Sequence, residues 1–224
     1  MLPLVGKWRQ CDEGPDHADR VPGGEHADGF EGFRICGGGR AFCRLGRLCP
    51  DCSPGDAADQ LGSAIAAAGI GLVFGGGDSG LMGRVARAVL AGGGRVTGII
   101  PKFLIKRENT LLNAQELIVV DDMHQRKQMM FDRADAFVAL PGGIGTLEEL
   151  VEQLTWVQLA RHRKPVLLAD IGGFWRPLLA LIAHMHNLGF LREGFDVHYL
   201  VAEKIEDVLP MLTAAAERAK ASAT

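Results

Sequence analysis

Short apolar segments alternate with amphipathic ones along the chain from about residue 56 onward. Uninterrupted apolar runs bounded by glycine or proline are typical of strands buried on both faces of a parallel sheet. The segments between them have the spacing of amphipathic helices and end at glycines. The pattern predicts strands over residues 33–36, 70–74, 95–100, 117–120, 136–140, 165–169 and 198–201, and helices over 57–68, 81–91, 123–133, 146–160, 174–188 and 205–220.

This alternation predicts an α/β fold in which helices cover both faces of a parallel sheet, as one domain over residues 33–220. Residues 1–32 are acidic and rich in His, Gly and Pro without periodicity, which predicts a disordered extension. Residues 37–55 are rich in Gly, Arg, Cys and Pro and match no regular element.

Composition restricts the choice of partners. A net charge of −3 and a pI near 6.2 give no basic field, so we expect no nucleic-acid partner. No apolar run reaches the roughly 18–20 residues that span a bilayer, so we expect no membrane association. The first residues lack the apolar core of a secretory signal, which predicts a cytoplasmic protein.

The five cysteines lie in the first quarter of the chain, and an odd number in a cytoplasmic protein argues against a disulfide framework. Only Cys49 and Cys52 form a C-x-x-C pair, and the histidines have no metal-binding spacing, so no metal site is expected. A zinc-stabilised interaction module built on these cysteines remains an alternative interpretation.

The strongest local motif is LPGGIGTLEEL, residues 140–150, in which a strand runs through a glycine turn into a helix. Glycines let the backbone approach an anion, and the amide groups at a helix N-terminus bind phosphate, with the Thr146 hydroxyl as a further donor. The alternative is a bare turn in which Thr146 and Glu149 form a capping box.

A second glycine loop, GGGDSGLMG at residues 75–83, follows the preceding strand, where either a ligand or tight packing explains it. Since ligands bind beyond the carboxyl ends of parallel strands, both loops should face one crevice. A third segment, MHQRK at 123–127, opens a helix with Arg126 and Lys127 in its first turns. Cations there oppose the helix dipole, which a bound phosphate would compensate; a solvated basic pair is the alternative.

These three segments together resemble the LOG (LONELY GUY) family of cytokinin riboside 5′-monophosphate phosphoribohydrolases, once described as lysine decarboxylases. The resemblance covers about residues 56–212. It implies a Rossmann-like, doubly wound nucleotide-binding domain, a homodimer with sites near the subunit interface, no cofactor, and Arg126 and Glu149 as the catalytic pair. The family's binding residues match Glu108, Lys127, Gly143, Ile144, Gly145, Thr146, Leu147, Glu148 and Thr155, and the glycine loops add Gly142, Gly76, Gly77, Gly80 and Met82 to the expected substrate-binding set.

The implied reaction releases adenine, plain or N6-modified, and ribose 5-phosphate from the nucleotide. Because cleavage of an N-glycosidic bond passes through a cationic sugar, a carboxylate beside the ribose is the expected stabiliser. Glu149 suits that role or the activation of water, and Arg126 that of orienting the reacting groups. Decarboxylation would need a Schiff-base lysine, and no feature singles out Lys102, Lys106 or Lys127.

The chain departs from the family at residues 37–55, where a nucleotide-binding loop and a helix are expected. We hypothesise a local shift of reading frame, which the nucleotide sequence tests: shifted codons that encode no family-like helix would exclude it. If the residues are as printed, one wall of the crevice differs. A non-catalytic nucleotide-binding protein of the same fold is therefore the alternative function.

Overall fold

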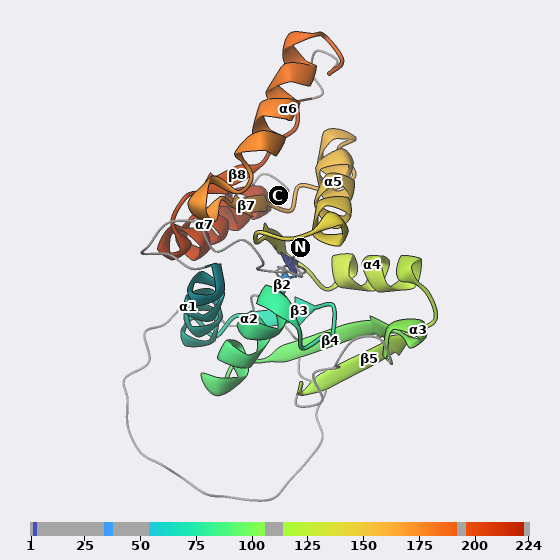
Figure 1. Cartoon of the computed structure of the whole chain (residues 1–224), viewed down its shortest axis with the longest axis vertical. Helices are drawn as coiled ribbons and strands as arrows, with labels where there is room; N and C mark the ends of the chain where they lie inside the picture. The colour runs from blue at the N-terminus through green and yellow to red at the C-terminus, as the bar shows by residue number, and fades with distance from the viewer. Residues whose placement is uncertain (1, 4–33, 38–53, 106–113, 192–195, 222–224) are drawn as a thin grey trace, which may run out of the picture.

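The computed structural model describes residues 2–3, 34–37, 54–105, 114–191 and 196–221 (Figure 1). Its strands are β1 (Leu2–Pro3), β2 (Arg34–Gly37), β3 (Gly71–Phe74), β4 (Val96–Pro101), β5 (Glu116–Val120), β6 (Ala136–Ala139), β7 (Val166–Ala169) and β8 (Leu200–Ala202). Its helices are α1 (Pro54–Ala67), α2 (Gly80–Ala91), α3 (Lys102–Ile105), α4 (Met123–Asp132), α5 (Ile144–Gln158), α6 (Arg176–Asn187) and α7 (Val208–Ala221), with 3-10 turns η1 (Ile171–Gly173) and η2 (Ile205–Asp207).

The main sheet confirms the predicted parallel α/β architecture. Its strand order is β5-β4-β3-β2-β6-β7-β8, and each neighbouring pair in that order is parallel. Two elements were not expected: the short helix α3, and β1, which pairs antiparallel with β6. Residues 2–3 therefore form a strand within the segment predicted to be disordered, and residues 4–33 lie outside the described part of the chain.

Helices cover both faces of the sheet because successive side chains of a strand point to opposite sides. In β6, Ala136 and Val138 pack into a core with α1, α2 and α7. Phe137 and Ala139 pack on the other side, in a second core that includes Leu150 and Leu154 of α5 and the partly buried face of α6. Because a core covers each face of the sheet, side chains on both sides of a strand are buried, which explains the uninterrupted apolar runs in the sequence.

The strand order reverses between β2 and β6, since β2 to β5 extend to one side and β6 to β8 to the other. In open α/β sheets, ligands bind at such a point, outside the carboxyl ends of the strands. The loop from β6 to α5 begins here, and the loop from β3 to α2 leaves the same end of the sheet. Among the described residues, no helix combines the length and apolar character needed to cross a bilayer.

His162 lies half-buried at the opposite end of the sheet, just ahead of β7. Its ring packs against Phe131 and Phe137, with ring centres 5.1 and 5.7 Å away. Its Nδ1 accepts a hydrogen bond from the Lys164 amide at 3.2 Å. Burial, assisted by the positive charge of Lys164, lowers the pKa of His162 to about 4.

This half-buried imidazole should make the free energy of unfolding depend on pH. Between its unfolded pKa, about 6.5, and its folded pKa, the unfolded chain binds a proton that the folded chain does not. The free energy of unfolding should therefore fall as the pH falls from about 6.5 toward 4, and His162→Phe should remove part of that loss. Urea unfolding at several pH values measures it, with His198→Phe, outside this aromatic cluster, as the control. Equal pH slopes for wild type and His162→Phe would contradict the assignment.

Candidate functional site

The glycine loop after β6 presents a helix N-terminus to solvent. Helix α5 starts at Ile144 with Gly143 as its N-cap, and its first internal hydrogen bond joins the Leu147 amide to the Gly143 carbonyl at 3.0 Å. An α-helix makes no internal bonds with the amide groups ahead of that point. Ile144 and Gly145 are exposed. This geometry suits an anion, since donors and the positive end of the dipole face outward.

Thr146 is not a helix cap. A capping box would require Thr146 at the N-cap position, but α5 begins two residues earlier than the sequence pattern predicts, so the capping-box alternative is wrong. Thr146 is instead buried, and its side chain lies over the loop. A Cβ at position 142 would come within 2.2 Å of Thr146 Oγ1, so only glycine fits there.

Arg126 and Glu149 form a buried ion pair that joins α4 to α5. Arg126 Nη1 lies 3.1 Å from Glu149 Oε1, and the two side chains are only 9% and 13% exposed. Arg126 Nε also donates to the Ile99 carbonyl in β4 at 3.2 Å. The predicted catalytic residues are therefore in direct contact, although they are 23 residues apart in the sequence.

Gly75, which is not among the predicted binding residues, makes room for this pair. A Cβ on Gly75 would lie 2.0 Å from Arg126 Nη2. The guanidinium therefore lies directly against the backbone where the first glycine loop begins. The run of three glycines at the end of β3 was the available signal, but only the position of Arg126 shows which glycine matters for it.

The other residues predicted in the first loop are buried or half-buried. Gly76 and Gly77 are buried, and Met82 belongs to the hydrophobic core. Gly76 has a φ of +81°, and a Cβ there would lie 3.0 Å from the Cβ of Ile100. Gly80, with a φ of +68°, is half-buried at the start of α2. Tight packing thus accounts for the glycine at position 76.

Lys127 is held by two carboxylates of α5. Its Nζ lies 2.7 Å from Glu148 Oε1 and 2.9 Å from Glu152 Oε1. The sequence led us to expect that a bound phosphate compensates for cations in the first turns of α4. In the structure, carboxylates from the neighbouring helix supply that compensation, for Lys127 as for Arg126. The interpretation of Lys127 as a solvated cation is wrong, because its side chain is only 15% exposed.

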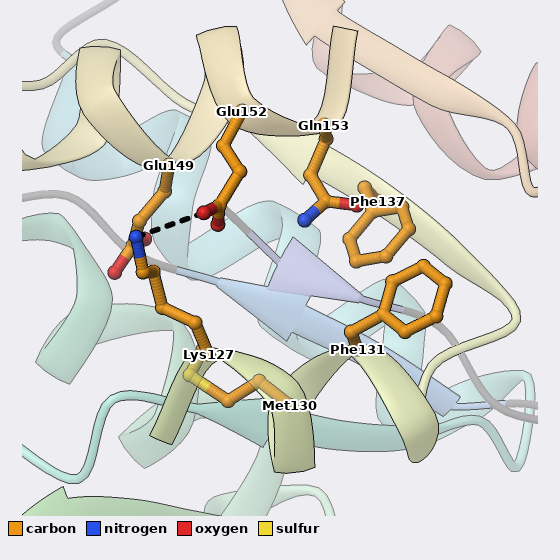
Figure 2. A pocket seen from close by; sticks show the side chains of 7 residues that line it. All are labelled: Lys127, Met130, Phe131, Phe137, Glu149, Glu152 and Gln153. Atoms are coloured by element: carbon orange, nitrogen blue, oxygen red, sulfur yellow. Dashed lines mark hydrogen bonds and ion pairs between the residues drawn. The ribbon is translucent and has the colours of Figure 1, made fainter. Parts of the chain in front are cut away.

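A small cavity lies between α4 and α5, behind Glu149 (Figure 2). Lys127 and Met130 approach it from α4, Glu152 and Gln153 approach it from α5, and its inner wall is aromatic. Gln153 is buried, and its Oε1 has no hydrogen-bond partner among the described residues. One side of Glu149 therefore faces a largely apolar interior.

Glu149 is nevertheless ionised. Burial raises the pKa of a carboxyl group, but nearby positive charges, Arg126 and Lys127 among them, outweigh this and hold the pKa of Glu149 below its ordinary value. At neutral pH the site thus contains a desolvated carboxylate beside a helix N-terminus. Such a group can stabilise a cation forming next to it.

One predicted binding residue, Thr155, is not brought to this place, and another lies outside the described part of the chain. Thr155 lies on an exposed face of α5, where its hydroxyl donates to the Val151 carbonyl at 2.8 Å. Six helical positions separate it from Glu149, so it points about 120° away around the helix axis. Glu108 lies outside the described residues, as do Cys11, Cys43, Cys49 and Cys52. Leu147 packs its side chain against the core.

The parallel sheet with its reversal point and glycine-loop helix places the chain in the Rossmann-like α/β class. A family model described as "Possible lysine decarboxylase" matches residues 82–212. The chain is 47% identical over 157 residues to the probable cytokinin riboside 5′-monophosphate phosphoribohydrolase LOGL1 of Oryza sativa subsp. japonica, covering 66% of this chain and 70% of that protein. It is also 47% identical over 156 residues to the Arabidopsis thaliana enzyme LOG7, covering 66% and 72%. The chain therefore belongs to the LOG family of cytokinin riboside 5′-monophosphate phosphoribohydrolases.

Solved structures support the fold at lower similarity. A molybdenum cofactor binding protein from Rippkaea orientalis matches with a TM-score of 0.57 and 22% identity, over 80% of this chain and 93% of that one. The molybdenum cofactor carrier protein of Chlamydomonas reinhardtii matches with a TM-score of 0.53 and 21% identity, over 76% and 94%. At this identity the likeness shows the fold alone.

The contact between Gly75 and Arg126 generates a prediction. Gly75→Ala should displace the guanidinium and reduce any activity that depends on the Arg126–Glu149 pair by at least about tenfold, while the protein still folds. Circular dichroism and steady-state turnover measure the two effects. Ser63→Ala, at an exposed position of α1, is the control. Normal turnover in Gly75→Ala would show that Arg126 need not occupy this place.

Proposed function

We propose that this protein hydrolyses the N-glycosidic bond of adenosine 5′-monophosphate or its N6-modified forms, releasing the free base and ribose 5-phosphate. The observation that carries the proposal is the buried Arg126–Glu149 pair one turn inside the helix whose N-terminus can hold a phosphate. The curated relatives carry the name of that activity. Arg126 and Glu149 are the proposed catalytic residues.

The helix geometry supports this placement. Glu149 follows Gly143–Gly145 by four to six residues, so it lies about 6–9 Å further along the α5 axis. A phosphate at the helix N-terminus would leave the ribose of the same nucleotide beside Glu149. The phosphate thus contributes binding energy that positions a bond elsewhere in the substrate.

In the proposed reaction, the bond between C1′ and N9 breaks and the base leaves with the bonding electrons and a proton. The oxygen of a water molecule bonds to C1′ and releases its own proton. Glu149 stabilises the positive charge on the ribose or accepts the proton from water. Arg126 positions the Glu149 carboxylate and keeps it ionised.

The decarboxylase description does not fit the described lysines. A Schiff-base lysine must lose its proton to attack a carbonyl. Burial lowers the pKa of Lys127, but hydrogen bonds to Glu148 and Glu152 outweigh it and raise the pKa above its ordinary value. Burial does lower the pKa of Lys164, but Lys164 precedes β7, at the end of the sheet opposite the site.

Release of free base tests the function. Wild-type protein incubated with AMP and with N6-isopentenyl-AMP should yield free base in a chromatographic assay, and Glu149→Gln should abolish it while the fold is kept. Glu217→Gln, an exposed carboxyl on α7, is the control. Adenosine should be a far poorer substrate, because each charge-assisted phosphate bond contributes about 1.5–3 kcal/mol. Nucleotide binding without base release would instead indicate the non-catalytic alternative.

We further propose that the protein acts as a homodimer through α5 and α6. The described residues include no buried side chain on α6, although its sequence is mainly apolar, and it extends beyond the other elements in Figure 1. Leu181, Leu188 and Phe190 are 49–77% exposed, and Val151 and Leu159 of the α5 segment are also exposed. Large exposed apolar surfaces mark interaction sites. A second copy on this surface would also give the exposed Thr155 a role in the partner's site.

Leu181→Glu should break this dimer by placing a charge in the apolar interface. Light scattering should give the mass of two chains for wild type and of one 24.0 kDa chain for the variant. Phe103→Glu on α3, 52% exposed, is the matched control and should remain dimeric. The monomer should also lose turnover if Thr155 acts across the interface. A monomeric wild type would rule the dimer out.

A further inference from the structure

A buried tryptophan lies against the strand from which the anion-binding loop begins. Trp175 is 3% exposed and precedes α6, but its indole Nε1 donates to the carbonyl of Ala139, the last residue of β6, at 3.1 Å. The loop Pro141–Gly145 follows one residue later. The ring also packs into the core that contains Leu150 of α5. Trp175 therefore contacts the strand that leads into the loop and shares a core with the helix that follows it.

A buried carboxylate holds Trp175 in turn. Asp170, at the carboxyl end of β7, is 3% exposed, and its Oδ1 accepts a hydrogen bond from the Trp175 amide at 2.6 Å. Its Oδ2 lies 3.6 Å from Nε of Arg176. The intervening Gly172 and Gly173 have φ values of +65° and +75°, so the turn that directs the indole back toward β6 favours glycine.

Ala139 is the last residue of β6 that pairs with β7, so no strand pairing supports the described residues of the loop beyond it, and a small tilt at Ala139 would move the loop and the helix start together. We propose that Trp175 is a positioning residue for the phosphate-binding loop, with Asp170 orienting Trp175. The inference rests on the proposed function only in taking the loop as the site of the substrate phosphate. Neither residue touches the reacting bond.

Trp175→Phe tests the bond, since it keeps a ring and removes the N–H. The KM for AMP should rise about five- to tenfold with kcat within about twofold, because the hydrogen bond acts on phosphate binding in the ground state and the transition state alike. Inhibition by ribose 5-phosphate should weaken by the same factor, and the low activity on adenosine should not change. Trp156→Phe, the same substitution on α5 away from the loop, is the control. An unchanged KM, or equal losses on AMP and adenosine, would overturn the proposal.

Two substitutions of Asp170 test independently whether its carboxylate orients Trp175. Asp170→Asn keeps an oxygen acceptor for the Trp175 amide and should leave the KM near that of wild type. Asp170→Ala removes the acceptor and should reproduce the Trp175→Phe effect. If the two Asp170 variants raise the KM equally, Asp170 does not orient Trp175 through this bond.

Hydrogen exchange of the Trp175 indole N–H tests the bond directly and does not depend on the activity of any variant. The indole N–H resonance of Trp175, assigned by its loss in Trp175→Phe, should exchange slowly with solvent and shift when AMP or inorganic phosphate is added. Exchange as fast as that of Trp156 would overturn the proposal even if a variant fails to fold. Calorimetry of AMP binding keeps the two proposals separate. If wild type binds AMP without cleaving it, the proposed function fails, and weaker AMP binding by Trp175→Phe still supports the positioning role.

Discussion

The buried ion pair between Arg126 and Glu149 is the interaction on which the site depends. Removing two charges from water is costly, and breaking such a pair by deleting one partner costs about 3–5 kcal/mol, so the surroundings must satisfy both groups. The Ile99 carbonyl accepts from the guanidinium, and Gly75 leaves it room. The pair thereby joins a strand, a loop and two helices, and it holds a carboxylate ionised where water is scarce.

Further ion pairs between α4 and α5 surround the Arg126–Glu149 pair. Glu148 and Glu152 hold Lys127, so α4 and α5 meet along a series of opposite charges. Cations in the first turns of α4 are unfavourable for an isolated helix, and carboxylates near the start of α5 offset them. The side chains of Arg126 and Glu149 are only 9% and 13% exposed, and a small cavity with aromatic walls lies behind Glu149 (Figure 2). Electrostatic stabilisation is stronger in such a setting than in bulk water.

The sheet determines where the glycine loop can act. The strand order reverses beside β6, so the loop and the α5 N-terminus open into the crevice at the reversal point. The opposite end of the sheet has a different character, with His162 and Lys164 packed around Phe131. The fold thus separates the end that can bind an anion from an end where His162 and Lys164 pack against aromatic rings.

The sequence by itself determined the alternation of strands and helices and the two glycine loops, because local periodicity and short motifs have physical effects that act within a few residues. The pair Arg126 and Glu149 followed from the resemblance of these motifs to the LOG family. The start of α5 was predicted two residues late, because its N-cap, Gly143, has no side chain to mark the position.

Only the tertiary structure decided which groups compensate the charges and which glycine makes room for them. Lys127 meets carboxylates 21 and 25 residues away, Gly75 meets Arg126, and the Trp175 indole meets the Ala139 carbonyl. None of these contacts has a periodic signal, because each depends on how separate elements pack across the sheet and on where long side chains end. Contacts of that kind form between segments distant in the sequence, so no local pattern encodes them.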